Sequence, residues 1–147
     1  MSVDENVALM KRWFREVWNE GRVETVYELL DPNAVAFGQT GGGEKTHGPK
    51  EFEGFMKTIR SAFPDITTKV EDAFGAGDRV VLRWSATMTH KGHGLGVPPT
   101  AKQVQVTGIT IARIVDGKIL EGWDNWDKFG MLQQVGVLPD LQLKKSA

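Results

Sequence analysis

The chain has 147 residues, of which 40% are hydrophobic and 25% charged, and its formal net charge is −1. This length fits a single domain, residues 1–147, that can bury a core without disulfides or a metal. The near-neutral charge excludes the long-range attraction that nucleic-acid binders and proteins bound to anionic membranes rely on. Cysteine is absent, which excludes disulfides and thiol nucleophiles.

The N-terminal segment MSVDENV is acidic and lacks the basic and then apolar pattern of a secretory signal. No apolar run approaches the ~20 residues that a membrane helix needs. The sequence therefore predicts a cytoplasmic protein whose partners include neither a membrane nor nucleic acid.

Apolar residues at three- and four-residue steps predict three helices in the first half of the chain. The first covers residues 4–19, and the second covers residues 23–30 and ends before Asp31-Pro32. The third begins at Pro49, a residue favoured in the first helical turn, and ends before Pro64-Asp65.

The apolar period then changes from about 3.6 to 2, which predicts strands. Asp116-Gly117 and the stretch 75–78 are hairpin signals. Asp127 fits the N-cap of a short helix that runs through Gln134 and is closed by Gly136. Residues 138–147 are expected to fray. The predicted strands cover residues 34–37, 66–74, 79–90, 102–115 and 118–126.

Helices followed by an antiparallel meander predict an α+β fold. We expect a cone-shaped barrel, in which a curved, mostly antiparallel sheet wraps about three N-terminal helices and leaves a hollow lined by aromatic side chains. The strands also carry Val81, Ile109 and Ile111 on their second face. These residues would otherwise lie exposed, so a homodimer through the outer sheet face is expected.

Asp72 falls on the same strand parity as Ile66, Val70 and Phe74. An acid on an apolar face must be paired, solvated or functional. Pairing with Arg79 or Arg83 is the ordinary explanation.

Four segments carry a resemblance to a known family: WFREVWNEGRVE, SAFPD, HGLGVPPTAKQVQVTGITIARIVDGKILEGW and DKFGMLQQVG. In this order they resemble the SnoaL-like polyketide cyclase family, part of the nuclear transport factor 2-like superfamily of conical α+β folds. The resemblance implies an intramolecular aldol cyclase that uses no cofactor and no metal, with an aspartate near the end of the last strand as general acid and base. It also implies a homodimer. Phe14 and Thr110 depart from the family, where a pocket hydroxyl and a pocket histidine are expected.

Two acids, Asp124 and Asp127, compete for the catalytic role. Asp127 matches the family position and is favoured, although it also fits a helix cap, and the two roles are compatible. Asp124 points the same way as Trp126 and opposite to Trp123 in a regular strand. Parity alone leaves both acids open, because a bulge near the strand end would reverse it.

A subset of the remaining residues is predicted to bind substrate. Thr110 or His93 could donate a hydrogen bond to an enolate oxygen. His90 and His93 invite a metal hypothesis, but no third ligand accompanies them, so no metal site is predicted. The predicted substrate-binding residues are Trp13, Phe14, Phe55, Trp84, His93, Thr110 and Trp123.

Three functional hypotheses follow. The first is a cofactor-independent cyclase or isomerase that acts on a small hydrophobic carbonyl compound, with proton abstraction by Asp127 or Asp124. The second is a binder that holds a small apolar ligand in the same cone without chemistry. The third is a purely structural or partner-binding module with a filled interior.

Overall fold

The computed structural model describes residues 1–40 and 43–139, so the predicted fraying of residues 140–147 lies outside the described part. No helix in these ranges is both long and apolar enough to cross a membrane. The helical elements are α1 (Val3–Trp13), η1 (Phe14–Asn19), α2 (Val23–Leu29), α3 (Gly48–Ala62) and α4 (Lys128–Val135). The strands are β1 (Leu30–Phe37), β2 (Lys45–His47), β3 (Thr67–Ala76), β4 (Arg79–Thr89), β5 (Gln103–Val115) and β6 (Lys118–Trp126).

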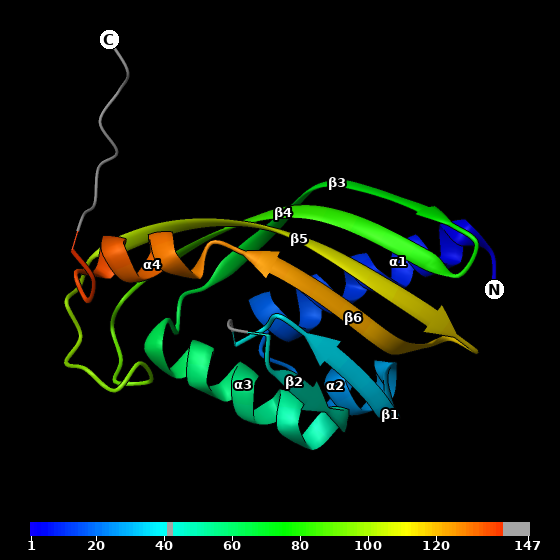
Figure 1. Ribbon diagram of the computed structural model, residues 1–147, viewed down its shortest axis with the longest axis horizontal. Coiled ribbons are helices and arrows are strands. Elements are labelled where there is room, and N and C mark those ends of the chain that lie inside the picture. Colours follow the sequence, from blue (N-terminus) through cyan, green and yellow to red (C-terminus); the bar gives the residue numbers. More distant parts are fainter. Residues whose placement is uncertain (41–42, 140–147) are drawn as a thin grey trace, which may run out of the picture.

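The six strands form one sheet in the order β2-β1-β6-β5-β4-β3. All neighbours are antiparallel except β1 and β6, which run parallel. The curved sheet arches over α1, α2 and α3, and α4 lies at one end (Figure 1). The α+β prediction is confirmed, but the expected barrel is not closed: β2 and β3 remain edges, and the helices cover the inner face between them.

The first helix is not one regular α-helix, as its apolar period had predicted. After Trp13 it continues as the π-helix η1, in which the Glu20 N–H donates to the Arg15 carbonyl five residues earlier at 3.0 Å. A five-residue repeat brings Trp13 and Trp18 to the same side. Both indoles therefore pack against Phe52 of α3, at 5.0 and 6.0 Å between ring centroids.

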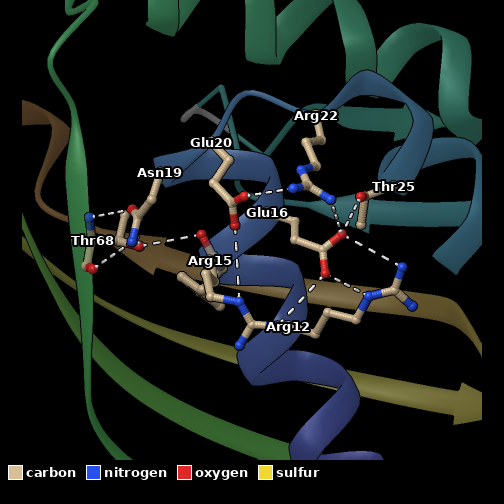
Figure 2. Close-up of polar contacts among 9 residues, drawn as sticks. Arg12, Arg15, Glu16, Asn19, Glu20, Arg22, Thr25 and Thr68 are labelled. Carbon is tan, nitrogen blue, oxygen red and sulfur yellow. Dashed lines mark hydrogen bonds and ion pairs between the residues drawn. The ribbon is translucent and has the colours of Figure 1, made fainter.

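The opposite side of η1 is held by a polar cluster around Glu16, which is only 8% exposed. Its carboxylate accepts from Arg12 Nε at 2.6 Å and from the Thr25 hydroxyl at 2.7 Å (Figure 2). These two hydrogen bonds, that of Arg12 first, hold the pKa of Glu16 below its ordinary value. The Asn19 side chain joins the same helix to β3, where its Oδ1 accepts from Thr68 N at 2.6 Å.

A bulge in β3 changes which side chains face inward. Val70 pairs with Trp84 and Asp72 with Arg83, so Glu71 is an extra residue. Beyond the bulge, Asp72 and Phe74 point outward and are exposed. The sequence prediction that Asp72 shares the apolar face was therefore wrong, and solvent takes the place of the expected arginine partner.

Gly108 allows Trp84 to lie close against the neighbouring strand. The two residues are paired between β4 and β5. A methyl group at Gly108 would come within 2.3 Å of the Trp84 ring and 2.9 Å of Trp126 Cβ. Both tryptophans therefore depend on a bare backbone at this point.

We predict that Gly108→Ala lowers the free energy of unfolding by about 1–3 kcal/mol, because it overpacks two tryptophans. Gly54→Ala on α3 is the matched control, since a methyl group there meets no atom within 4 Å. Gly54→Ala should raise the free energy of unfolding by up to about 1 kcal/mol. Urea unfolding measures both, and equal effects in the two variants would contradict the packing described here.

Candidate functional site

A cavity of about 910 Å³, counting the part open to solvent, lies between the sheet and the helices. Its wall is mostly aromatic and aliphatic. Rings come from Trp13, Phe14, Trp18, Phe52, Phe55, Trp84 and Trp126, and polar side chains come from Gln39, Thr68, Thr110 and Asp124.

A second bulge decides which acid enters the cavity. Arg113 pairs with Glu121 and Ile114 with Ile119, which leaves Leu120 as the extra residue of β6. The bulge moves Gly122 and Asp124 to the inner face, and both line the cavity. Without the bulge, every second residue after Ile119 would face inward, and Trp123 would line the cavity in place of Asp124.

The carboxylate of Asp124 is held by a directed chain of hydrogen bonds. Trp84 Nε1–H donates to Thr110 Oγ1 at 3.0 Å, and the Thr110 hydroxyl donates to Asp124 Oδ1. Because the indole can only donate, it fixes the direction of the threonine proton. The chain therefore ends on an acceptor, which favours the ionised carboxylate.

Burial nevertheless dominates the acidity of this group. Removal from bulk water raises the pKa of Asp124 to about 6, and the hydrogen bonds from Thr110 and Gln39 offset only part of that rise. Such a carboxyl group is mostly ionised at neutral pH yet basic enough to take a proton. This is the property expected of a general base.

Gln39 comes from the connection between β1 and β2 and is not among the site residues that we predicted from the sequence. The residue is only 8% exposed. Its side-chain Oε1 accepts from the Thr46 hydroxyl, and its backbone carbonyl accepts from Trp126 Nε1, each at 2.9 Å. No local sequence signal marks it, because these partners come from other strands.

Asp127, which the sequence analysis favoured, lies outside the cavity wall. It is the N-cap of α4, as predicted, and its Oδ1 accepts from Gly130 N–H at 2.9 Å. The residue is exposed. Its geometry is that of a helix cap.

Five of the seven residues expected to bind substrate line the cavity: Trp13, Phe14, Phe55, Trp84 and Thr110. Trp123 does not, because the bulge turns it to the outer face, where its ring stacks on Phe37 at 6.0 Å between centroids. His93 lies in the connection after β4 and is not part of the cavity wall.

His90 is fully buried, and its ring holds the connection between β4 and β5 in place. Its Nδ1 accepts from Thr100 N–H at 3.2 Å, so the ring proton sits on Nε2. The ring packs against Phe63 at 5.6 Å between centroids. Among residues 1–40 and 43–139, no group of three or more His, Asp or Glu is arranged to hold a metal ion.

The raised pKa of Asp124 makes a prediction about stability. Its folded-state pKa lies above the ordinary 3.8, so the folded protein binds this proton more tightly than the unfolded chain does. Stability is therefore lost as the pH rises from about 4 to 6. A shift of this size corresponds to about 3 kcal/mol above pH 6.

We expect Asp124→Asn to be more stable than wild type by up to about 3 kcal/mol at pH 8. The advantage should vanish below pH 4, where the wild-type acid is also neutral. Urea unfolding across this pH range measures the difference. If the stability difference between Asp124→Asn and the wild type is the same at pH 8 as at pH 4, Asp124 is not desolvated.

Comparisons with known proteins agree with this architecture. The chain is 29% identical over 123 residues to nogalonic acid methyl ester cyclase of Streptomyces nogalater. The alignment covers 81% of this chain and 89% of the relative. It is 26% identical over 122 residues to aklanonic acid methyl ester cyclase DnrD of Streptomyces peucetius, covering 82% and 84%.

Solved structures give the same picture. AclR of Streptomyces galilaeus, described as a candidate hydroxylase, superposes with a TM-score of 0.83 at 29% identity and covers 96% of this chain and 87% of its own. IdmH of Streptomyces antibioticus, described as a candidate polyketide cyclase, gives 0.75 at 33% identity, covering 89% and 98%. The family model described as SnoaL-like polyketide cyclase matches residues 8–135. The chain belongs to the SnoaL-like polyketide cyclase family.

Proposed function

We propose that the protein is a cofactor-independent enzyme that removes a proton next to a carbonyl group of a small hydrophobic substrate, with Asp124 as general base. The observation that carries this proposal is the carboxyl group of Asp124, which lies in a mostly apolar cavity wall where burial raises its pKa to about 6. The apolar wall suits a substrate made mostly of rings. Desolvation and basicity arise from the same burial.

The chemistry has two steps. Asp124 takes the proton from the carbon next to the carbonyl, and the electrons of the broken C–H bond form an enolate. In an aldol closure, the enolate carbon then attacks a second carbonyl of the same molecule, and the new alkoxide takes the proton back from Asp124. In an isomerisation, the proton returns to a different carbon. Both reactions share the first step.

The names of the relatives favour ring closure. Two of them are methyl ester cyclases. By this analogy we propose a polyketide-type ester as the substrate class, which supplies both carbonyl groups that an aldol closure needs. The alternative is a binder that holds an apolar ligand in the same cavity, in which case the raised pKa of Asp124 has no chemical use.

Exchange of a carbon-bound proton separates these functions. We predict that the wild-type protein accelerates deuterium incorporation next to the carbonyl of a bicyclic ketone such as 2-tetralone, followed by mass spectrometry in D₂O. Asp124→Asn should lose at least ~100-fold of the acceleration, because it keeps the shape but not the base. Asp127→Asn should retain it, since asparagine is an equally good N-cap.

The pH dependence follows from the same group. A general base acts only when ionised, so the exchange rate should rise with pH and level off above about 6. Exchange that Asp127→Asn abolishes and Asp124→Asn preserves would reverse the assignment. Tight binding of the ketone without any exchange would favour the binder.

We also propose that a second copy of the chain packs against the outer face of the sheet. That face carries Ile109, which is 49% exposed, and a hollow that Ile111 and Trp123 help to line. Arg83 and Glu71 line the same hollow. A two-fold contact can place these opposite charges against each other.

Sedimentation velocity tests this arrangement. We expect a dimer for the wild type and a monomer for Ile109→Lys, because the lysine would bury a charge at the apolar contact. Thr87→Lys, at an exposed position of β4 outside the hollow, is the control and should remain a dimer. A monomeric wild type at every soluble concentration would contradict the proposal.

A further inference from the structure

An enolate needs a hydrogen-bond donor for its oxygen, and the two donors suggested by the sequence do not serve. The Thr110 hydroxyl receives the Trp84 N–H on its oxygen and gives its proton to Asp124. That proton is committed to the base. His93 is not part of the cavity wall. Neither residue can therefore approach a substrate oxygen next to Asp124 as a free donor.

The carboxamide of Gln39 fits this need. It lines the cavity beside Asp124, and its amide lowers the pKa of that carboxyl group. Its Oε1 already accepts the Thr46 hydroxyl at 2.9 Å, which turns the NH₂ end toward the carboxylate. A carboxylate only accepts, so one amide hydrogen goes to Asp124. The second has no partner in the described part of the chain.

Resting on the proposed function, we infer that Gln39 is a catalytic residue that donates its second amide hydrogen to the substrate's carbonyl oxygen while Asp124 removes the adjacent proton. The hydrogen bond strengthens as the carbonyl oxygen takes up the charge of the enolate. In one H–C–C=O fragment, Asp124 then contacts the hydrogen and Gln39 contacts the carbonyl oxygen. A neutral amide also adds no charge that would compete with the carboxylate.

The backbone around Gln39 is fixed in a way that supports a positioned donor. Trp126 Nε1 holds the Gln39 carbonyl at 2.9 Å, and Lys128 Nζ holds the next carbonyl, of Thr40, at 2.6 Å. Gly38, with φ of +82°, lies so close to β6 that a methyl group there would come within 2.0 Å of the Asp124 carbonyl oxygen. The donor is thus anchored to the strand that carries the base.

Binding of 2-naphthol tests the inference without requiring turnover. Its ionised oxygen on an apolar ring system resembles an enolate, and its absorbance reports ionisation. The test uses Asp124→Asn, in which residue 124 is neutral as it is once it has taken the proton. In this background we expect the pKa of bound naphthol to fall below its value in water.

Adding Gln39→Leu should raise the pKa of bound naphthol by about one unit and weaken naphtholate binding by about tenfold. The affinity for 2-methylnaphthalene, which has no oxygen, should change little and serves as the control for cavity shape. Unchanged naphtholate binding in Gln39→Leu would overturn the inference. If Gln39→Leu does not fold, Gln39→Asn decides instead, because its shorter side chain withdraws the donor and should produce the same loss.

Thr46→Val gives a second, independent readout, since it keeps Gln39 but releases the oxygen that orients its amide. In the Asp124→Asn background, Thr46→Val should weaken naphtholate binding by part of the loss seen with Gln39→Leu. Unchanged naphtholate binding in Thr46→Val would contradict the proposed orientation of the amide. Proton exchange by the wild type tests Asp124 separately. Exchange without any Gln39 effect on naphtholate rejects this inference alone, whereas a Gln39 effect without exchange rejects the proposed function and leaves Gln39 as a residue that only binds the oxygen.

Discussion

The site depends on one physical constraint: a carboxyl group, Asp124, is held away from bulk water by a wall of aromatic and aliphatic side chains. Burial raises its pKa to about 6, while hydrogen bonds from Thr110 and Gln39 keep it from rising further. The opposing effects leave an acid that is ionised near neutral pH and still a useful base. An acid in water would be a weaker base, and one buried without donors would stay protonated.

This arrangement costs stability, and the rest of the fold is built to tolerate it. The cavity leaves part of the core unfilled, and the charge inside it opposes folding above pH 6. The buried apolar side chains form two clusters, one around Phe52 and Leu82 and the other around Phe63 and Val104. They supply the apolar burial that the cavity gives up.

Much of the architecture could be predicted from the sequence, because it follows from apolar period and turn chemistry. The last strand was predicted at residues 118–126 and is observed there, and Asp127 caps the following helix as its residue type suggests.

The features that shape the site were not predictable in this way. The extra residues Glu71 and Leu120 reverse which side chains of β3 and β6 face inward. The π-turn after Trp13 changes which side of the first helix the following residues occupy. Each is a one-residue departure that depends on tertiary pairing. Gln39 was missed for the same reason, since its partners Thr46, Asp124 and Trp126 belong to three separate contacts made only in the folded chain.

The most direct measurement of the central claim is the pKa of the Asp124 side-chain carboxyl carbon, followed by ¹³C NMR titration and assigned by comparison with Asp124→Asn. We predict a midpoint near 6. The midpoint should rise when Thr110→Val removes the hydroxyl that donates to the carboxylate. A midpoint at the ordinary 3.8, unchanged in Thr110→Val, would mean that water reaches the group freely and that the cavity does not create a base.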